Sequence, residues 1–126
     1  MKRFVWVVFI GLLMVPAMAF AHGAKGPHGG QMLLAGSHRF EMVVGSSNFT
    51  IYVMDMKKHV LPLKGVSGSA TVHSNNDKDS NEVPLVVESD HLVGKLDLKK
   101  LGKAEVHAKI TVDGKEATMA FEYPED

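Results

Sequence analysis

The sequence predicts an all-β fold, a single antiparallel β-sandwich of seven or eight short strands with an Ig-like arrangement. Three observations indicate it. Apolar and polar residues alternate within short segments along most of the chain. Glycine, serine, asparagine and aspartate separate these segments at short intervals. No stretch keeps a helical period beyond one or two turns. The domain is expected to occupy residues 31–126.

The clearest local signal is the Asp113-Gly114 dipeptide, which stands between two alternating runs. Asp-Gly favours a two-residue hairpin turn, because both turn residues must adopt positive φ. We therefore expect residues 104–112 and 115–123 to pair. Their inward-facing side chains would be Val106, Ala108, Ile110, Val112, Ala117, Met119 and Phe121.

The remaining strands follow from the same alternation. In residues 48–55, Phe49, Ile51 and Val53 face the core, and Met54 lies on the opposite, outward face. Residues 60–63 are typical of an edge segment, because Pro62 has no N–H to donate to a ladder, and a single helical turn is expected near residues 99–102. Further strands are expected at residues 31–35, 39–44, 66–73, 83–87 and 91–98.

The N-terminus has the layout of a secretory signal peptide, residues 1–21. It begins Met1-Lys2-Arg3, continues with an apolar run over residues 4–14, and ends in the small-x-small site Ala19-Phe20-Ala21. The apolar run is shorter than the roughly 20 residues that span a bilayer. We therefore expect cleavage after Ala21, release into a bacterial periplasm, and no membrane attachment afterwards.

Composition restricts the function of the mature chain. Removing residues 1–21 from the 126 leaves 105, enough for one domain, with 12 of the 14 basic residues against all 14 acidic ones. This balance argues against nucleic acid as a partner. There is no cysteine, so a metal must be bound by histidine, methionine, carboxylate or the N-terminus. No Ser-His-Asp arrangement, phosphate loop or HExxH motif is present, so we expect neither an enzyme nor an organic cofactor.

Cleavage would leave His22 as the first residue of a Gly/His-rich arm, residues 22–30, which has four glycines and one proline. Such a composition predicts a flexible segment. The amine and imidazole of His22, together with the imidazole of His28, suit Cu(II) or Zn(II). We expect the primary metal site here; the alternative is an exposed tail that binds nothing.

A secondary site is expected at His38, Met54, Met56 and His59, because thioethers and imidazoles suit the soft ion Cu(I). The alternative is that the methionines only fill gaps. If residues 31–44 form a hairpin, His28 and His38 lie at opposite ends, about 16 Å apart, and cannot share an ion. The other histidines are expected at the surface without a ligand role: His73, His91 and His107.

Three short motifs carry a resemblance. They are the run from Gly26 to Gln31 (Gly-Pro-His-Gly-Gly-Gln), the run from His38 to Val43, and the run from Ile51 to Asp55. Together they resemble small periplasmic heavy-metal-associated domains, which occur alone or as the N-terminal domain of adaptor subunits in metal-efflux pumps. The resemblance covers about residues 22–65. A weaker similarity, limited to the N-terminal histidine, is to periplasmic copper-resistance sandwich proteins.

The residues and the resemblance together predict a function. The mature chain is expected to be a periplasmic metal-binding accessory protein that buffers, delivers or senses metal beside an efflux system. Copper is the first choice of ion, with zinc or a related divalent ion as the other, and an efflux-pump adaptor or another periplasmic protein is the expected partner. The alternative is a structural or protein-interaction β-sandwich of the periplasm that uses no metal.

Overall fold

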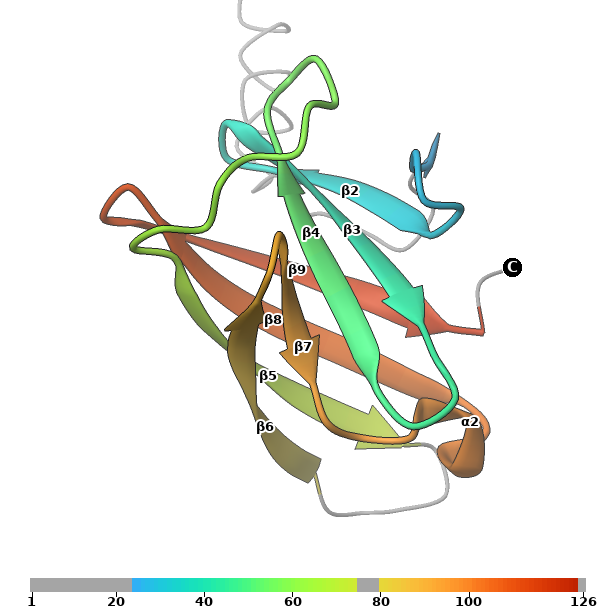
Figure 1. Cartoon of the computed structure of the whole chain (residues 1–126). Helices are drawn as coiled ribbons and strands as arrows, with labels where there is room; N and C mark the ends of the chain where they lie inside the picture. The colour runs from blue at the N-terminus through green and yellow to red at the C-terminus, as the bar shows by residue number, and fades with distance from the viewer. Residues whose placement is uncertain (1–23, 75–79, 125–126) are drawn as a thin grey trace, which may run out of the picture.

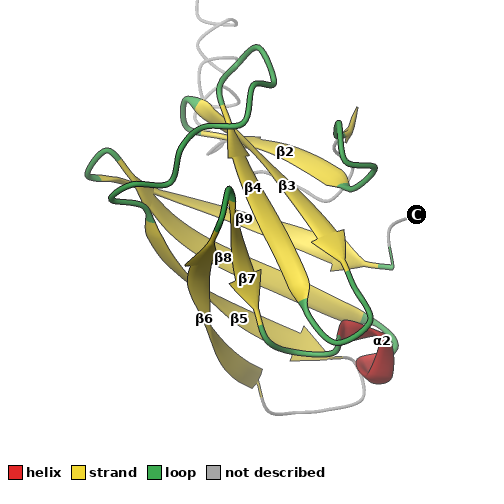
Figure 2. Cartoon of the chain, in the orientation of Figure 1, coloured by secondary structure: helices red, strands yellow, loops and turns green. Residues whose placement is uncertain are grey.

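The computed structural model describes residues 24–74 and 80–124, and these form nine β-strands and one short helix (Figure 2). The predicted signal peptide and His22 lie outside the described residues. No helix within the described ranges is long and apolar enough to cross a bilayer. The elements are β1 (Ala24–Lys25), β2 (Gln31–Ala35), β3 (His38–Val44), β4 (Phe49–Met54), β5 (Ser67–Ser74), β6 (Ser80–Glu88), β7 (His91–Gly94), α2 (Leu98–Leu101), β8 (Ala104–Val112) and β9 (Lys115–Tyr123).

The strands form one antiparallel sheet in the order β1-β2-β3-β4-β7-β6-β5-β8-β9, curled into a half-barrel (Figure 1). The predicted all-β antiparallel class is confirmed. The prediction of two separate sheets is corrected, because the hydrogen bonding continues from one wall to the other through β6. Leu85 of β6 pairs with Gly94 of β7 on one side and with Gly68 of β5 on the other.

The two ends of the curled sheet meet where β9 lies against β2. There the backbone N–H of Glu122 donates a hydrogen bond of 3.0 Å to the side-chain oxygen of Gln31. Gln31 is buried at this seam. Since this contact is made by a side chain and not by a strand ladder, the sheet stays open as a half-barrel.

The core lies between the wall of β2, β3, β4 and β7 and the wall of β5, β8 and β9 (Figure 1). The inward faces are those that the alternation predicts, and burial of these apolar side chains is the main stabilising contribution. The fit is close at Gly94, where an added Cβ would lie 2.3 Å from Cζ of Phe49. The large side chains that are fully buried in this core include Phe40, Phe49, Phe121, Ile51, Leu92 and Ile110.

The element boundaries test the sequence prediction. The Asp113-Gly114 hairpin is confirmed, with φ of 53° and 77° at its two turn residues and strands over 104–112 and 115–123. The predicted edge segment at residues 60–63 is reduced to one isolated bridge, Met54 with Val60. The strand predicted over 91–98 ends at Gly94, because Asp97 caps α2 by accepting from the N–H groups of the next residues.

Part of the predicted flexible arm is ordered. Ala24 and Lys25 form β1 and pair with Met32 and Gln31 of β2. The loop between them is closed by two hydrogen bonds, from the N–H of Gly26 to the carbonyl of residue 30 (2.8 Å) and from the N–H of residue 29 to the carbonyl of Gly26 (3.0 Å). Residues 24–30 of the predicted flexible arm therefore lie in a hydrogen-bonded loop, and the site described next shows what holds it.

Candidate functional site

A buried carboxylate organises the N-terminal loop. Glu41 lies on the outer face of β3, yet its side chain is 0% exposed because residues 26–30 fold over it. One carboxylate oxygen, Oε2, accepts hydrogen bonds from the backbone N–H of His28 (2.8 Å) and of Gly30 (2.7 Å). A buried charge is costly unless it is hydrogen-bonded. These bonds hold the loop in place.

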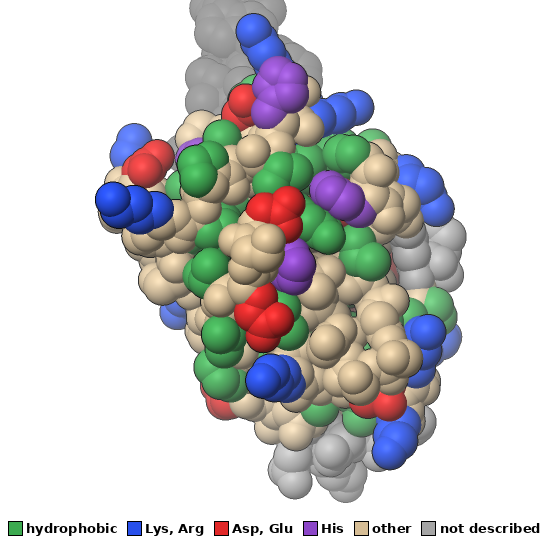
Figure 3. All heavy atoms as spheres, viewed as in Figure 1, with side chains coloured by type: hydrophobic (Ala, Val, Ile, Leu, Met, Phe, Trp, Pro, Cys, Tyr) green, Lys and Arg blue, Asp and Glu red, His purple; other side chains and the backbone are tan. Residues whose placement is uncertain are grey.

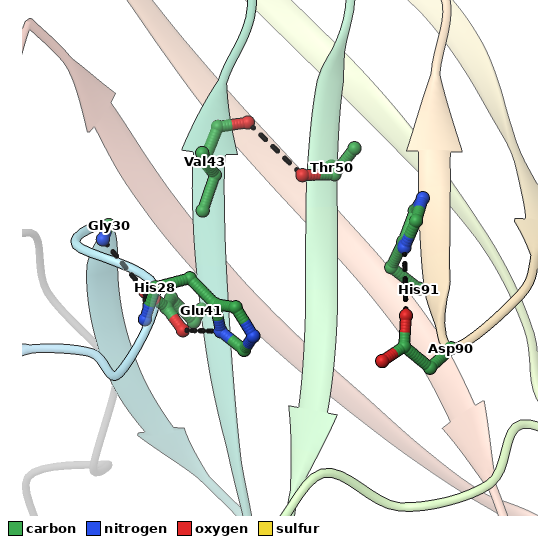
Figure 4. Close-up of polar contacts among 7 residues, drawn as sticks. All are labelled: His28, Gly30, Glu41, Val43, Thr50, Asp90 and His91. Atoms are coloured by element: carbon green, nitrogen blue, oxygen red, sulfur yellow. Dashed lines mark hydrogen bonds and ion pairs between the residues drawn. The ribbon is translucent and has the colours of Figure 1, made fainter.

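The other oxygen of Glu41, Oε1, lies 2.8 Å from Nδ1 of His28 (Figure 4). An ionised carboxylate only accepts, so Nδ1 carries the proton in this pair. A neutral imidazole then keeps a lone pair on Nε2, the ring nitrogen that Figure 4 shows turned away from Glu41. The His28 side chain is 34% exposed, so the pair combines a buried carboxylate with an accessible imidazole.

Two glycines make this close approach possible. A Cβ on Gly26 would lie 2.3 Å from Cδ of Glu41, and a Cβ on Gly30 would lie 2.2 Å from the carbonyl oxygen of Met42. Both distances are far shorter than a carbon atom tolerates, so any larger residue would force the loop off β3. The glycines that suggested flexibility in the sequence are needed here for packing.

A tyrosine supports the histidine ring. Tyr52 of β4 is the cross-strand neighbour of Glu41, and its ring stacks on that of His28 with centroids 3.7 Å apart and planes 3° apart. Burial raises the pKa of the Tyr52 phenol above its ordinary 10.0, and the charges of Asp90 and Glu41 raise it further. Stacking and the Glu41 hydrogen bond together fix the plane and the direction of the imidazole.

A second histidine–carboxylate pair lies beyond Tyr52. The His91 ring is 5.4 Å from that of Tyr52, and its Nδ1 is 3.1 Å from Oδ1 of Asp90. Figure 4 places His28 and His91 on opposite sides of β4, and each ring contacts that of Tyr52. Figure 3 shows histidine and acidic side chains gathered among apolar ones on this face.

The residues of the predicted secondary site lie at one end of β3 and β4, but they do not form the expected cluster. Met54 pairs with Arg39, whose Nε donates to the carbonyl of Met56 at 3.2 Å. The sequence predicts Met54 on the outward face of β4, held there as a ligand, but its side chain is 0% exposed. The chain returns after β4, where Val60 forms an antiparallel bridge with Met54 at the end of the strand.

The other members of that set differ in exposure. Met56 is 48% exposed, and the His59 side chain is 73% exposed with its Nδ1 3.3 Å from Oδ2 of Asp55. The His38 ring is half-buried and tilted towards Phe40, with centroids 6.4 Å apart. Burial of Met54 therefore removes the thioether that was expected to join the strand to these loop residues.

Within residues 24–74 and 80–124, no three histidine, aspartate or glutamate side chains converge as a metal-binding group. His28 therefore needs partners from elsewhere if it binds an ion. Searches of family models, curated proteins and solved structures find no match for this chain. The function must accordingly be argued from the site.

Sequence reasoning missed Glu41, and also the roles of Tyr52, Asp90 and His91. The one signal for Glu41 was an acidic residue between the apolar residues Phe40 and Met42. Alternation places such a residue on the outer face, where solvent is the usual surrounding. Only the fold-back of the N-terminal loop turns this position into a buried one.

Proposed function

We propose that this chain is an exported, periplasmic metal-binding accessory protein, with Nε2 of His28 as a ligand to copper or, second, to zinc. The observation that carries the proposal is the 2.8 Å contact between Nδ1 of His28 and the buried carboxylate of Glu41. Histidines that bind metals commonly donate their other ring N–H to a carboxylate, which fixes the tautomer and strengthens the ligand. This is the arrangement that Glu41 provides.

Glu41 acts in this proposal as a positioning residue and not as a ligand. Its two oxygens already accept three hydrogen bonds, and the side chain is 0% exposed. Tyr52 contributes in a different way, since its ring keeps the imidazole plane fixed. A ligand held in one orientation loses less conformational entropy when the metal binds.

The proposal assigns the remaining protein ligands to the amine and imidazole of His22, the residue that follows the expected cleavage site. Ala24 pairs with Met32, and Met32 is the cross-strand neighbour of Glu41. Ala24, two residues after His22, therefore lies two strands from Glu41 in the same sheet. The amine must be unprotonated to bind, so affinity should fall as the pH drops.

The role beside an efflux system, with a pump adaptor or another periplasmic protein as partner, rests on the resemblance of the residue 22–65 region to heavy-metal-associated domains. On this proposal the protein buffers, delivers or senses the ion and catalyses no reaction. An accessible imidazole with fixed orientation is sufficient for binding and exchange, and no nucleophile accompanies it among the contacts of His28.

One observation favours a different function, a protein-interaction module without metal. Val86 and Val87 of β6 are 47% and 42% exposed, and Leu34 of β2 is 48% exposed. Apolar side chains of this size on a surface are typical of contact sites when they are contiguous. On this alternative the His28–Glu41 pair serves only to fasten the loop.

Titration of the mature chain, beginning at His22, with Cu(II) and Zn(II) at neutral pH distinguishes the metal-binding proposal from the interaction module. A Kd below about 10 μM for the tightest event supports the metal-binding proposal. His28→Asn should weaken that event at least tenfold, about 1.4 kcal/mol. The control is His59→Asn, which removes an exposed imidazole whose carboxylate partner is also partly exposed, and it should change the affinity less than about twofold. Equal effects of the two variants, or no event this tight, would favour the interaction module.

A further inference from the structure

Two histidines that sequence analysis assigned to the plain surface lie against each other on the opposite wall of the half-barrel. His73 of β5 and His107 of β8 have ring centroids 5.0 Å apart and ring planes 89° apart. The register explains the contact: His73 is opposite Glu105, and His107 is opposite Thr71, so the two rings are diagonal neighbours on one outer face. The contact therefore follows from backbone pairing and not from a loop.

Acidic side chains lie beside this pair. Oε1 of Glu105 is 2.6 Å from Nε2 of His107, and the two side chains are 50% and 44% exposed. Glu105 pairs across the ladder with Glu122 of β9. His73 lines, together with both glutamates, a hollow of about 270 Å³ that is open to solvent. Both imidazoles are thus accessible, and the hollow at His73 is lined by Lys103 as well as by the two glutamates.

The spacing of the rings fits a shared ion. A divalent transition metal lies about 2.0–2.1 Å from each histidine nitrogen, and two imidazoles bound to one ion then have centroids about 4.5–5 Å apart. The rings of His73 and His107 already have this separation. His28 and His91, in contrast, have the ring of Tyr52 between them. Of these two histidine pairs, only His73 and His107 have rings in direct contact, one edge-on to the other.

We propose that His73 and His107 form a second, open site for one divalent transition metal ion, Cu(II) or Zn(II), with solvent completing the coordination. Glu105 is a positioning residue in this site: it holds the Nε2 proton of His107 and leaves the other ring nitrogen free to bind. No third histidine or carboxylate converges within the described ranges, so the site should be weaker than a closed cage and should exchange its ion readily. It goes beyond the proposed function and does not depend on His28.

The experiment uses the mature chain carrying His22→Asn and His28→Asn, titrated with Zn(II) and with Cu(II), while the side-chain imidazole signals are followed by NMR. We expect one ion per chain, with the His73 and His107 signals shifted by Zn(II) and broadened by Cu(II) before those of any other histidine. His73→Asn or His107→Asn should each weaken this event at least about tenfold. The matched control is His91→Asn, which removes a carboxylate-paired imidazole that has no second imidazole in ring contact, and its effect should be under about twofold.

Unchanged affinity in the His73→Asn/His107→Asn double variant would overturn the proposal, as would an equal loss in His91→Asn or NMR changes spread evenly over all histidines. Both side chains are exposed, so these variants should fold, and circular dichroism checks this. A failure of this proposal can be told apart from a failure of the proposed function. The proposed function fails if the tightest metal-binding event has an unaltered Kd in the chain carrying His28→Asn alone.

Discussion

Two histidine–carboxylate pairs on the same side of the molecule have similar chemistry and different surroundings. Nδ1 of His28 is 2.8 Å from Glu41, whose side chain is 0% exposed, whereas Nδ1 of His59 is 3.3 Å from Asp55, whose side chain is 39% exposed. A charge pair in water contributes little, because solvent screens it and the side chains lose entropy. When one partner is buried, removing either group lowers the free energy of unfolding strongly, because it leaves a buried charge or a buried donor without its partner.

The pairs also differ in what they join. Asp55 accepts the backbone N–H groups of Lys57 (2.8 Å) and His59 (2.9 Å), all within its own turn. Glu41 accepts N–H groups from residues 11 and 13 positions away and so joins the N-terminal loop to β3. The difference teaches that Glu41 determines where His28 lies, whereas Asp55 only shapes a turn.

The largest expected effect comes from removing the buried carboxylate. Glu41→Ala should lower the free energy of unfolding by about 3 kcal/mol, because it leaves two backbone N–H groups and the imidazole without their acceptor. Asp55→Ala should lower the free energy of unfolding clearly less, because water can take the place of an exposed carboxylate. Urea denaturation followed by circular dichroism measures both; losses of equal size would show that burial does not distinguish the pairs.

The next effect tests the contact between the loop and the carboxylate. Gly26→Ala should lower the free energy of unfolding by about 1–3 kcal/mol, because the new Cβ would lie 2.3 Å from Cδ of Glu41. In a Glu41→Ala background the same change should cost almost nothing, since the atoms it meets are gone. A double-mutant cycle measures this coupling, and simple additivity of the two costs would contradict the packing described here.

The pairs should differ in their influence on metal affinity. Glu41→Gln keeps the shape but removes the charge that holds the His28 tautomer, so it should weaken the tightest Cu(II) event about tenfold or more. Asp55→Asn, the matched change in the exposed pair, should leave Cu(II) affinity within about twofold. Calorimetric titration measures the Cu(II) affinity of both variants. A Glu41→Gln protein with native affinity would show that the carboxylate does not position a ligand.

A smaller effect concerns the tyrosine between the two histidines. Burial, Asp90 and Glu41 hold the pKa of Tyr52 above its ordinary 10.0. The folded state therefore binds the phenol proton more tightly than the unfolded state. The resulting contribution to stability is complete below pH 10.0 and is lost as the pH rises through the folded pKa. Asp90→Asn should lower this pKa only in part, because burial is the larger cause.

Ultraviolet absorbance of the phenolate, compared with that of a Tyr52→Phe protein, follows this titration. A Tyr52 pKa at or below the ordinary value would contradict the burial of the ring, and an unchanged pKa in Asp90→Asn would show that the carboxylate is too well solvated to act on it.

The smallest effect belongs to the exposed pair. The pKa of Asp55 is below its ordinary 3.8, chiefly because the carboxylate accepts the backbone N–H of His59. Its contribution to stability is present above that ordinary value and is lost as the pH falls through the lowered pKa. His59→Asn should leave most of the lowering in place, since the backbone N–H stays. NMR of the carboxyl carbon follows this titration. A pKa of Asp55 back at its ordinary value in the His59→Asn protein would show that the imidazole is the main cause of the lowering.

Much of the fold follows from local signals. The alternation of Phe49, Ile51 and Val53 predicts the inward face of β4, and Asp113-Gly114 predicts the last hairpin to the residue. Such features depend on the side-chain period of a strand and on the φ angles of a turn, and both are properties of neighbouring residues.

The candidate site was predictable only in part. His28 stands out in the sequence because it lies in a glycine-rich segment, but its partner Glu41 lies 13 residues away. Met54 shows the same effect: alternation places it on the outer face of β4, but its side chain is 0% exposed. In both cases a later or earlier segment covers a strand face that looks solvent-exposed in isolation.

The sequence by itself determined the β class, most strand positions, the inward core faces and the chemistry that histidine brings to a chain without cysteine. Only the tertiary structure decided that the walls belong to one sheet, that residues 26–30 fold over β3, and that Glu41 rather than solvent holds His28. The reason is physical. Alternation and turn geometry act between adjacent residues, whereas burial of a charge depends on segments that approach each other only after the sheet has curled.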